Sequence, residues 1–205
     1  MAAAVALLLG VGPVAALVEP PTAALEGTVQ VGAESRPAHL RFGCAADPRD
    51  GALSVELWVP EAFTRKDFDY DDFEGPDAPA GRRALTTIRM SGEHGMTEMS
   101  TAVAGWYAGD DPDTFVLAVS EVVRRPGKVA RLLGALDATR DRILWVQPRF
   151  DDATRTLQAS FALDPAAVAK IHAVVAPCLA AGAGAASATR PSPSPHGSSS
   201  KPDRR

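Results

Sequence analysis

The segment LSVELWV, residues 53–59, alternates apolar and polar positions along its length and is followed by Pro60. Leucine and valine take every second position, while Ser54, Glu56 and Trp58 stand between them. Successive side chains of a β-strand point to opposite faces, so this period of two predicts a strand with one face in the protein core. The fold is therefore expected to be built on a sheet.

On both sides of this segment, short runs of similar character predict further strands. These runs lie at 28–31, 38–44, 85–90, 97–107, 115–122, 143–146 and 156–163. Turn sequences separate several of them: DPRDG at 47–51, SGEHG at 91–95 and GDDPD at 109–113. Strands joined by short turns pair antiparallel, so we expect a meander of hairpins.

Two segments of the C-terminal half have helical periodicity. Within 126–138 the apolar residues recur at spacings of three and four, and Pro126 is acceptable in a first turn. The second segment opens at Asp164-Pro165, a typical N-cap pair, and Pro177 is expected to end it because proline lacks the helical N–H donor. The predicted fold class is α+β, with an antiparallel sheet of about 6–8 strands and two helices on one face.

The two cysteines of the chain follow predicted elements. Cys44 ends a predicted strand, and Cys178 ends the second predicted helix. In an oxidising compartment an even count of two is most simply one disulfide, and two buried free thiols are the alternative. The sequence lacks the short Cys or His spacings of a zinc site. A single Cys44–Cys178 bridge would tie the last helix to an early strand.

The N-terminus indicates export. Residues 2–11 are an apolar run, followed by Gly12-Pro13 and by small residues up to Ala16. This order is typical of a secretory signal cleaved after Ala16 or as late as Ala24, although no lysine or arginine precedes the run. A buried helix or a membrane anchor is the alternative, but the run is shorter than the about 20 residues that a membrane span needs.

The predicted organisation has three parts. Residues 1–24 form a signal peptide, residues 25–180 form a single exported α+β domain, and residues 181–205 form a disordered tail whose small and polar residues cannot build a core. The predicted location is periplasmic or secreted, without a stable membrane anchor.

The charge of the chain excludes one class of partner. The formal net charge is -4 at pH 7 and the calculated pI is about 5.6. Because the chain has no excess of lysine and arginine to neutralise phosphates, we expect no general nucleic-acid binding.

The most unusual stretch is DFDYDDFEGPD, residues 67–77, which we call the acidic loop. The simplest interpretation is that Phe68, Tyr70 and Phe73 cover the sheet edge while the carboxylates stay in solvent. A second interpretation makes the loop a surface that attracts a basic partner by its charge. The candidate residues for such a surface are Asp67, Asp69, Tyr70, Asp71, Asp72, Phe73 and Glu74.

A third interpretation of the acidic loop is a calcium site. Carboxylates at Asp67, Asp69 and Asp71 match the start of a calcium loop, in which alternate oxygens converge on the cation. The later positions do not follow that pattern, because Asp72 stands where a glycine is needed and Ala78 where a glutamate is needed. We therefore assign no metal ligand and expect no cofactor.

Enzymatic motifs are absent from the sequence. It contains no G-x-S-x-G elbow, no H-E-x-x-H zinc motif and no phosphate-binding glycine loop. The candidate bases His39, His94, His172 and His196 are each interpreted as surface residues. We assign no catalytic residue.

The C-terminal third resembles the closing layout of small exported bacterial proteins of the invasion-associated locus B family. The resemblance rests on a helix with Leu132, Leu133 and Leu136, a short strand, a strand ending at 161–163, and a helix that finishes at Cys178. It covers about 50 residues and is a similarity of layout. It implies a periplasmic or secreted all-β or α+β module without known catalytic residues.

Three functions are consistent with these observations. The favoured one is a non-enzymatic periplasmic or secreted binding module for an unknown protein or small ligand. The alternatives are a small exported hydrolase, whose site is assembled from distant residues, and a calcium-stabilised module that uses the acidic loop.

Overall fold

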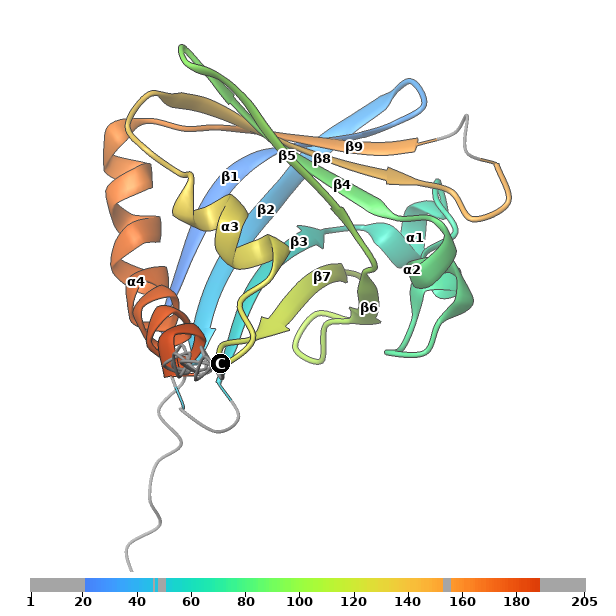
Figure 1. Cartoon of the computed structure of the whole chain (residues 1–205). Helices are drawn as coiled ribbons and strands as arrows, with labels where there is room; N and C mark the ends of the chain where they lie inside the picture. Colours follow the sequence, from blue (N-terminus) through green and yellow to red (C-terminus); the bar gives the residue numbers. More distant parts are fainter. Residues whose placement is uncertain (1–20, 46, 48–50, 153–155, 189–205) are drawn as a thin grey trace, which may run out of the picture.

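A computed structural model describes residues 21–45, 47, 51–152 and 156–188 of the chain. Nine strands in this part of the chain form one antiparallel sheet, which is strongly curled (Figure 1). The strands are β1 (Thr22–Val31), β2 (Glu34–Ala45), β3 (Ala52–Val59), β4 (Thr86–Gly92), β5 (Gly95–Thr101), β6 (Ala104–Tyr107), β7 (Phe115–Val122), β8 (Arg140–Pro148) and β9 (Thr156–Ala162).

The order of the strands shows how far the sheet curls. Across the sheet the order is β5-β4-β8-β9-β1-β2-β3-β7-β6, so the two edge strands are β5 and β6. These two strands follow each other in the chain and are joined only by Ala102 and Val103. Because consecutive Cα atoms are 3.8 Å apart, the Cα atoms of Thr101 and Ala104 lie within about 11 Å of each other. The sheet therefore curls until its two edges meet at this point.

The two-residue link between β5 and β6 shows that our predicted number of strands was too low. We expected one strand over 97–107 and about 6–8 strands in all, whereas this segment forms β5 and β6 on opposite edges and the sheet has nine strands. At the break, the backbone N–H of Val103 donates to the carbonyl of Gly81 at 3.0 Å rather than to a neighbouring strand. The Val103 side chain is buried, which fixes the link against the core.

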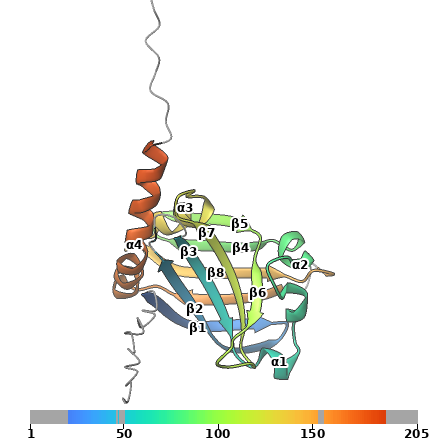
Figure 2. The ribbon, with the colours of Figure 1, turned by 90° about the horizontal axis from the view of Figure 1, so that it is seen from below.

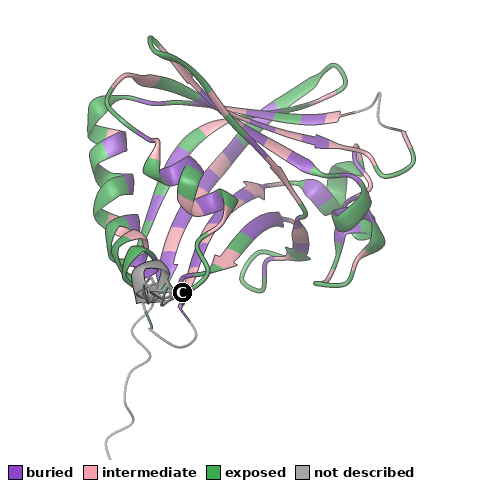
Figure 3. Cartoon of the chain, in the orientation of Figure 1, coloured by how far each residue is buried: buried purple, intermediate pink, exposed green. Residues whose placement is uncertain are grey.

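The strand alternation is confirmed. In β3 every second residue from Leu53 to Val59 is buried, and Ser54, Glu56 and Trp58 are only partly covered. Figure 3 shows the same alternation of buried and less buried residues along the central strands. The buried faces of the strands line the inside of the curl and form one hydrophobic core.

Two helices contribute to this core. Helix α3 (Lys128–Gly134) contacts β3, β5 and β7, and helix α4 (Pro165–Ala188) contacts β1, β2 and β3. The predicted N-cap is confirmed, since the Asp164 carboxylate accepts a hydrogen bond from the Ala167 N–H at 2.7 Å. Helix α3 is shorter than the predicted 126–138. Three further short helices, which we did not predict, lie between β3 and β4: α1 (Ala62–Arg65), η1 (Tyr70–Phe73) and α2 (Pro79–Arg83).

Our prediction that Pro177 ends the last helix is wrong. Helix α4 continues through Pro177 to Ala188, and its axis changes direction on the way (Figures 1 and 2). Proline removes one helical hydrogen bond and typically kinks a helix. The helix continues because Val175 and Cys178, on either side of the proline, are both buried against the sheet, so packing outweighs the lost bond.

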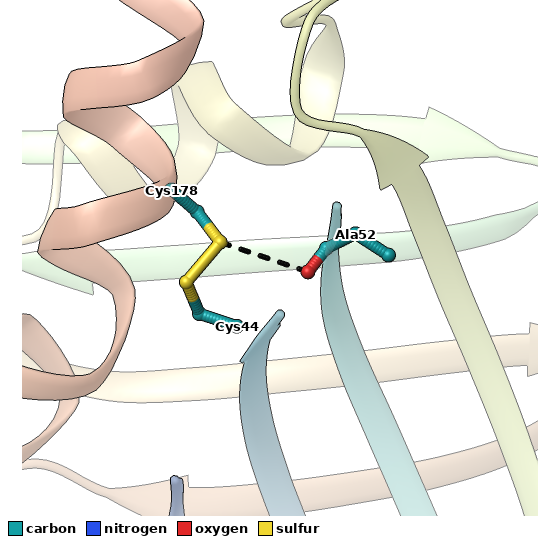
Figure 4. The surroundings of a disulfide bond; sticks show 3 residues. All are labelled: Cys44, Ala52 and Cys178. Carbon is teal, nitrogen blue, oxygen red and sulfur yellow. Dashed lines mark hydrogen bonds between the residues drawn. A yellow bond between two sulfur atoms is a disulfide. The ribbon is translucent and has the colours of Figure 1, made fainter. Parts of the chain in front are cut away.

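The predicted disulfide is present. Cys44 at the end of β2 and Cys178 in α4 are bonded, with Cα atoms 5.9 Å apart, and both are buried (Figure 4). The Cys178 sulfur also lies 3.6 Å from the Ala52 carbonyl oxygen at the start of β3. A disulfide sulfur carries no hydrogen, so this approach is a packing contact. The bridge fastens α4 across the ends of β2 and β3.

The ends of the domain differ from the predicted boundaries. Strand β1 begins at Thr22, before the predicted start at 25, and α4 extends to Ala188, so residues 181–188 are helical rather than part of a disordered tail. The predicted signal segment up to residue 20 and the tail from 189 onward lie outside the described residues. By length and composition alone, Pro165–Gly184 of α4 would suffice to cross a membrane.

Candidate functional site

The acidic loop belongs to a segment, residues 60–85, that links β3 to β4 and holds α1, η1 and α2. We call it the capping segment, because Figure 1 shows it at the end of the curled sheet opposite α4. Its Glu74 and Gly75 form bridges with Gly105 of the edge strand β6, and the Gly75 N–H donates to the Gly105 carbonyl at 2.8 Å. The capping segment therefore covers the β6 edge of the sheet.

The aromatic residues of the acidic loop are core residues. Phe68, Tyr70 and Phe73 are all almost fully buried. Phe68 stacks on Phe73 at a centroid distance of 5.6 Å, and Tyr70 packs on Phe115 of β7 at 5.2 Å. Tyr70 and Phe73, which we listed among the candidate partner-binding residues, are buried and hold the loop on the sheet. Of that set, the exposed residues are Asp71, Asp72 and Glu74.

The simplest interpretation expected all carboxylates of the acidic loop to stay in solvent, but some of them are partly buried in ion pairs. The Asp67 carboxylate forms an ion pair with Arg36 of β2, whose side chain is only 5% exposed. The same guanidinium donates to the Tyr70 hydroxyl at 2.8 Å and to the Pro60 carbonyl at 3.0 Å. Burial raises the pKa of the Tyr70 phenol. This cluster joins β2 to the start of the capping segment at Pro60 and to the first residues of the acidic loop.

The other carboxylates of the loop face different partners. Asp69 pairs with Arg149, which also pairs with Asp151 at 3.1 Å, and Asp71 accepts a hydrogen bond from the Tyr107 hydroxyl at 2.7 Å. Burial, followed by the bond to Asp71, raises the pKa of Tyr107. In the part of the chain that the structure describes, no group of three His, Cys, Asp or Glu side chains is placed to hold a metal ion. The geometry therefore gives the calcium interpretation no support.

A cavity of about 430 Å³ opens beside η1 and α1. Four of its lining residues are acids, two are cations, and Phe63 and Tyr107 supply aromatic surface. Its charged lining residues are Lys66, Asp69, Asp71, Asp72, Arg149 and Asp151. Phe63 is 59% exposed and lies edge-on to Tyr107 at 6.1 Å. The cavity therefore combines excess negative charge with an accessible aromatic ring, and we call it the acidic cavity.

A second cavity, of about 600 Å³, adjoins the acidic cavity and shares Phe68 and Arg149 with it. It lies against the β1–β2 turn, where Gly32 has a φ of +60° that favours glycine. Its walls are mainly polar, with Gln30, Glu34 and Gln158 among the lining residues. Arg149 and its ion pair with Asp69 thus lie where the two cavities join.

Of the four candidate histidines, His196 lies outside the described residues and the other three do not meet. His39 lies in β2, His94 in the turn between β4 and β5, and His172 in α4, where its ring nitrogen lies 2.6 Å from the Leu136 carbonyl. None of them lines either cavity. The structure thus brings together none of the described histidines that we considered as bases.

Sequence reasoning missed the partners that the loop finds in distant segments. Arg36 and Arg149 lie 31 residues or more from the carboxylates of the acidic loop that they bind, and Tyr107 lies 36 residues from Asp71. Only Phe63 and Lys66 carried a local signal, since both lie within the four residues before the loop. The Lys66 ammonium lies 5.4 Å from the centre of the Phe63 ring.

The fold and cavities define this protein as a disulfide-bonded α+β domain with a curled antiparallel sheet and an acidic cavity at one end. No protein-family profile, curated protein or solved structure matches the chain.

Proposed function

We propose that this protein is a non-enzymatic interaction module of the periplasm or the extracellular space, and that the acidic cavity binds a basic side chain of a partner. The observation that carries the proposal is the lining of the cavity, in which Asp71 and Asp72 are exposed beside the accessible ring of Phe63. Carboxylates bind guanidinium and ammonium groups, and aromatic faces add cation–π attraction.

The position of Lys66 supports this choice of ligand. Its ammonium group lies over the Phe63 ring, so a cation of the protein itself already occupies the aromatic face. Lys66 is exposed and forms no ion pair with another described residue, so a partner's cation could displace it. Such binding would strengthen at low ionic strength.

Two features support the proposed location. The bond between Cys44 and Cys178 is of the kind that persists in oxidising compartments. Of the two cleavage positions considered, Ala16 leaves β1 intact, whereas Ala24 lies within β1 opposite Arg41 of β2. We therefore favour cleavage after Ala16. The resemblance to the invasion-associated locus B family points to the same location and stays a prediction.

The binding proposal is tested with a short acetylated peptide that alternates glycine and arginine, titrated by calorimetry at low and high salt. We expect binding that salt weakens, and we expect the double variant Asp71→Asn/Asp72→Asn to lose about fivefold or more in affinity. Glu93→Gln is the matched control, because Glu93 is also exposed but lies in the β4–β5 turn away from the cavity.

Equal affinity of the double variant and the wild type would overturn the proposal, as would no detectable binding of the peptide to the wild type. Under this proposal the melting temperature does not respond to calcium or to a chelator. A rise with calcium would favour the calcium-stabilised alternative instead.

A further inference from the structure

Strand β5 is an open edge of the sheet. It pairs with β4 on one side, and none of the described strands pairs with its other side. The opposite edge strand, β6, is instead bridged by the capping segment through Gly105. An uncovered strand edge presents backbone N–H and C=O groups that can pair with an added strand.

One contact shows which residues of β5 face the open side. The Ser100 carbonyl accepts a hydrogen bond from the Lys128 ammonium of α3 at 2.5 Å, so it points away from β4. The N–H and C=O of one residue point to the same side of an antiparallel strand, and the side alternates along the strand. Met96, Glu98 and Ser100 therefore present their backbone groups outward, which suits an added segment of about five residues.

A groove runs beside this edge. It has a volume of about 360 Å³ and lies between β5 and α3, with the buried side chains of Met99 and Leu132 in its wall. Lys128 and Arg131 also line it, and both are exposed. Neither forms an ion pair with any residue in the described part of the chain. Glu98 lines the groove as well, but it is paired with Arg89, so the unpaired charges of the groove are basic in a protein of net charge -4.

We propose that the β5 edge and this groove dock an extended acidic peptide segment of a partner protein, which joins the sheet as an additional strand. Its backbone pairs with Met96, Glu98 and Ser100, where it displaces the Lys128 ammonium from the Ser100 carbonyl. Its acidic side chains enter the groove and pair with Lys128 and Arg131. The apolar side chains at the alternate positions point to the opposite face of the sheet. The site shares no residue with the acidic cavity, so either proposal can fail without the other.

The probe is a dye-labelled, capped pentapeptide that alternates glutamate and valine, titrated by fluorescence anisotropy. Glu98→Pro removes one outward N–H, which an edge strand tolerates, and Glu98→Ala removes the same side chain but keeps that N–H. We expect Glu98→Pro to bind about fivefold or more weakly than Glu98→Ala, since one hydrogen bond is lost. The double variant Lys128→Ala/Arg131→Ala should weaken binding by about tenfold, and raised salt should weaken binding to the wild type.

Two further peptides separate strand addition from attraction between charges. A version with lysine in place of glutamate should not bind, and a version with N-methylated backbone amides should bind much more weakly than the parent peptide. Binding of the parent peptide should also slow hydrogen exchange at the amides of Met96, Glu98 and Ser100 in the wild type, a readout that does not depend on any variant folding. Equal affinity of Glu98→Pro and Glu98→Ala, or unchanged exchange at these amides, would overturn the proposal.

Discussion

Arg36 connects the sheet to Pro60 and to the start of the acidic loop. It binds the Pro60 carbonyl, the Asp67 carboxylate and the Tyr70 hydroxyl, and the ion pair is largely shielded from water, with side-chain exposures of 5% and 12%. Burial opposes the charge of Arg36, but its bond to Asp67 and the attraction of Tyr70 and Asp67 leave its pKa above the usual value. The cluster is therefore a stable part of the fold.

Removing Arg36 should be costly because Asp67, which pairs with no other cation among the described residues, would be left charged in a poorly solvated place. We expect Arg36→Ala to lower the free energy of unfolding by about 3 kcal/mol or more, as for other broken buried pairs. Urea denaturation measures the change. The matched variant is Arg36→Met/Asp67→Leu, which removes both charges and should recover much of the loss. A double variant no more stable than Arg36→Ala would contradict this account.

The chain has two tyrosines, Tyr70 and Tyr107, and the phenol pKa of each is raised, with burial as the largest cause. The folded protein therefore holds these protons more tightly than the unfolded chain, whose phenols titrate near about 10. Their contribution to stability is complete below about pH 10 and is lost as the pH rises further.

The direction of the two phenol pKa shifts can be checked by alkaline titration of the phenolate absorbance. The native protein should show less phenolate than the urea-unfolded protein at each pH just above about 10. The variant Tyr107→Phe isolates the signal of Tyr70. Coincident titration curves for the folded and unfolded protein would rule out the stabilisation that we describe.

At the scale of elements, α3 begins without a capping side chain of its own. Gly127 stands at the N-cap position, and the Glu121 carboxylate from β7 accepts hydrogen bonds from the N–H groups of Gly127, Val129 and Ala130 at 2.8–3.0 Å. The first helical N–H groups of α3 thus find their acceptor in a neighbouring strand.

We expect Glu121→Ala to destabilise the protein by about 2 kcal/mol, because several helix donors lose one shared acceptor. Glu121→Gln, which keeps one carbonyl acceptor, should lie between Glu121→Ala and the wild type. Thermal unfolding followed by circular dichroism gives the ranking. If alanine and glutamine were equally well tolerated, the carboxylate would not be the cap.

The elements also show what local sequence could predict. Alternation located β3, and the pair Asp164-Pro165 located the start of α4, because both signals depend on neighbouring residues. The break at Val103 and the passage of α4 through Pro177 depend instead on Gly81, the sheet and the disulfide, all distant in sequence. The partners of the acidic loop could not be predicted for the same reason. Arg36 and Arg149, which pair with Asp67 and Asp69, are distant from them in sequence and come close only in the folded chain.

At the scale of the whole molecule, the disulfide closes a loop with a sequence separation of 134 residues. Such a bridge lowers the chain entropy of the unfolded state, which stabilises the folded protein by about 4 to 5 kcal/mol. We expect Cys44→Ala/Cys178→Ala, or the reduced protein, to lose stability of this order, as measured by urea denaturation with and without reductant.

Thiol labelling of the unfolded, unreduced protein is the control, because it should detect no free thiol. Two labelled thiols, or a midpoint of unfolding that does not respond to reductant, would contradict the structural role of the bridge.

Strand β1 lies between β2 and β9, so the middle of the sheet joins the first of the described strands to the last of them. A chain that emerges N-terminus first, from a ribosome or a secretion channel, therefore exposes one side of β1 until residue 162 has followed. Until then that strand can pair with foreign backbones, and a holding factor that shields it would raise the yield of folded protein.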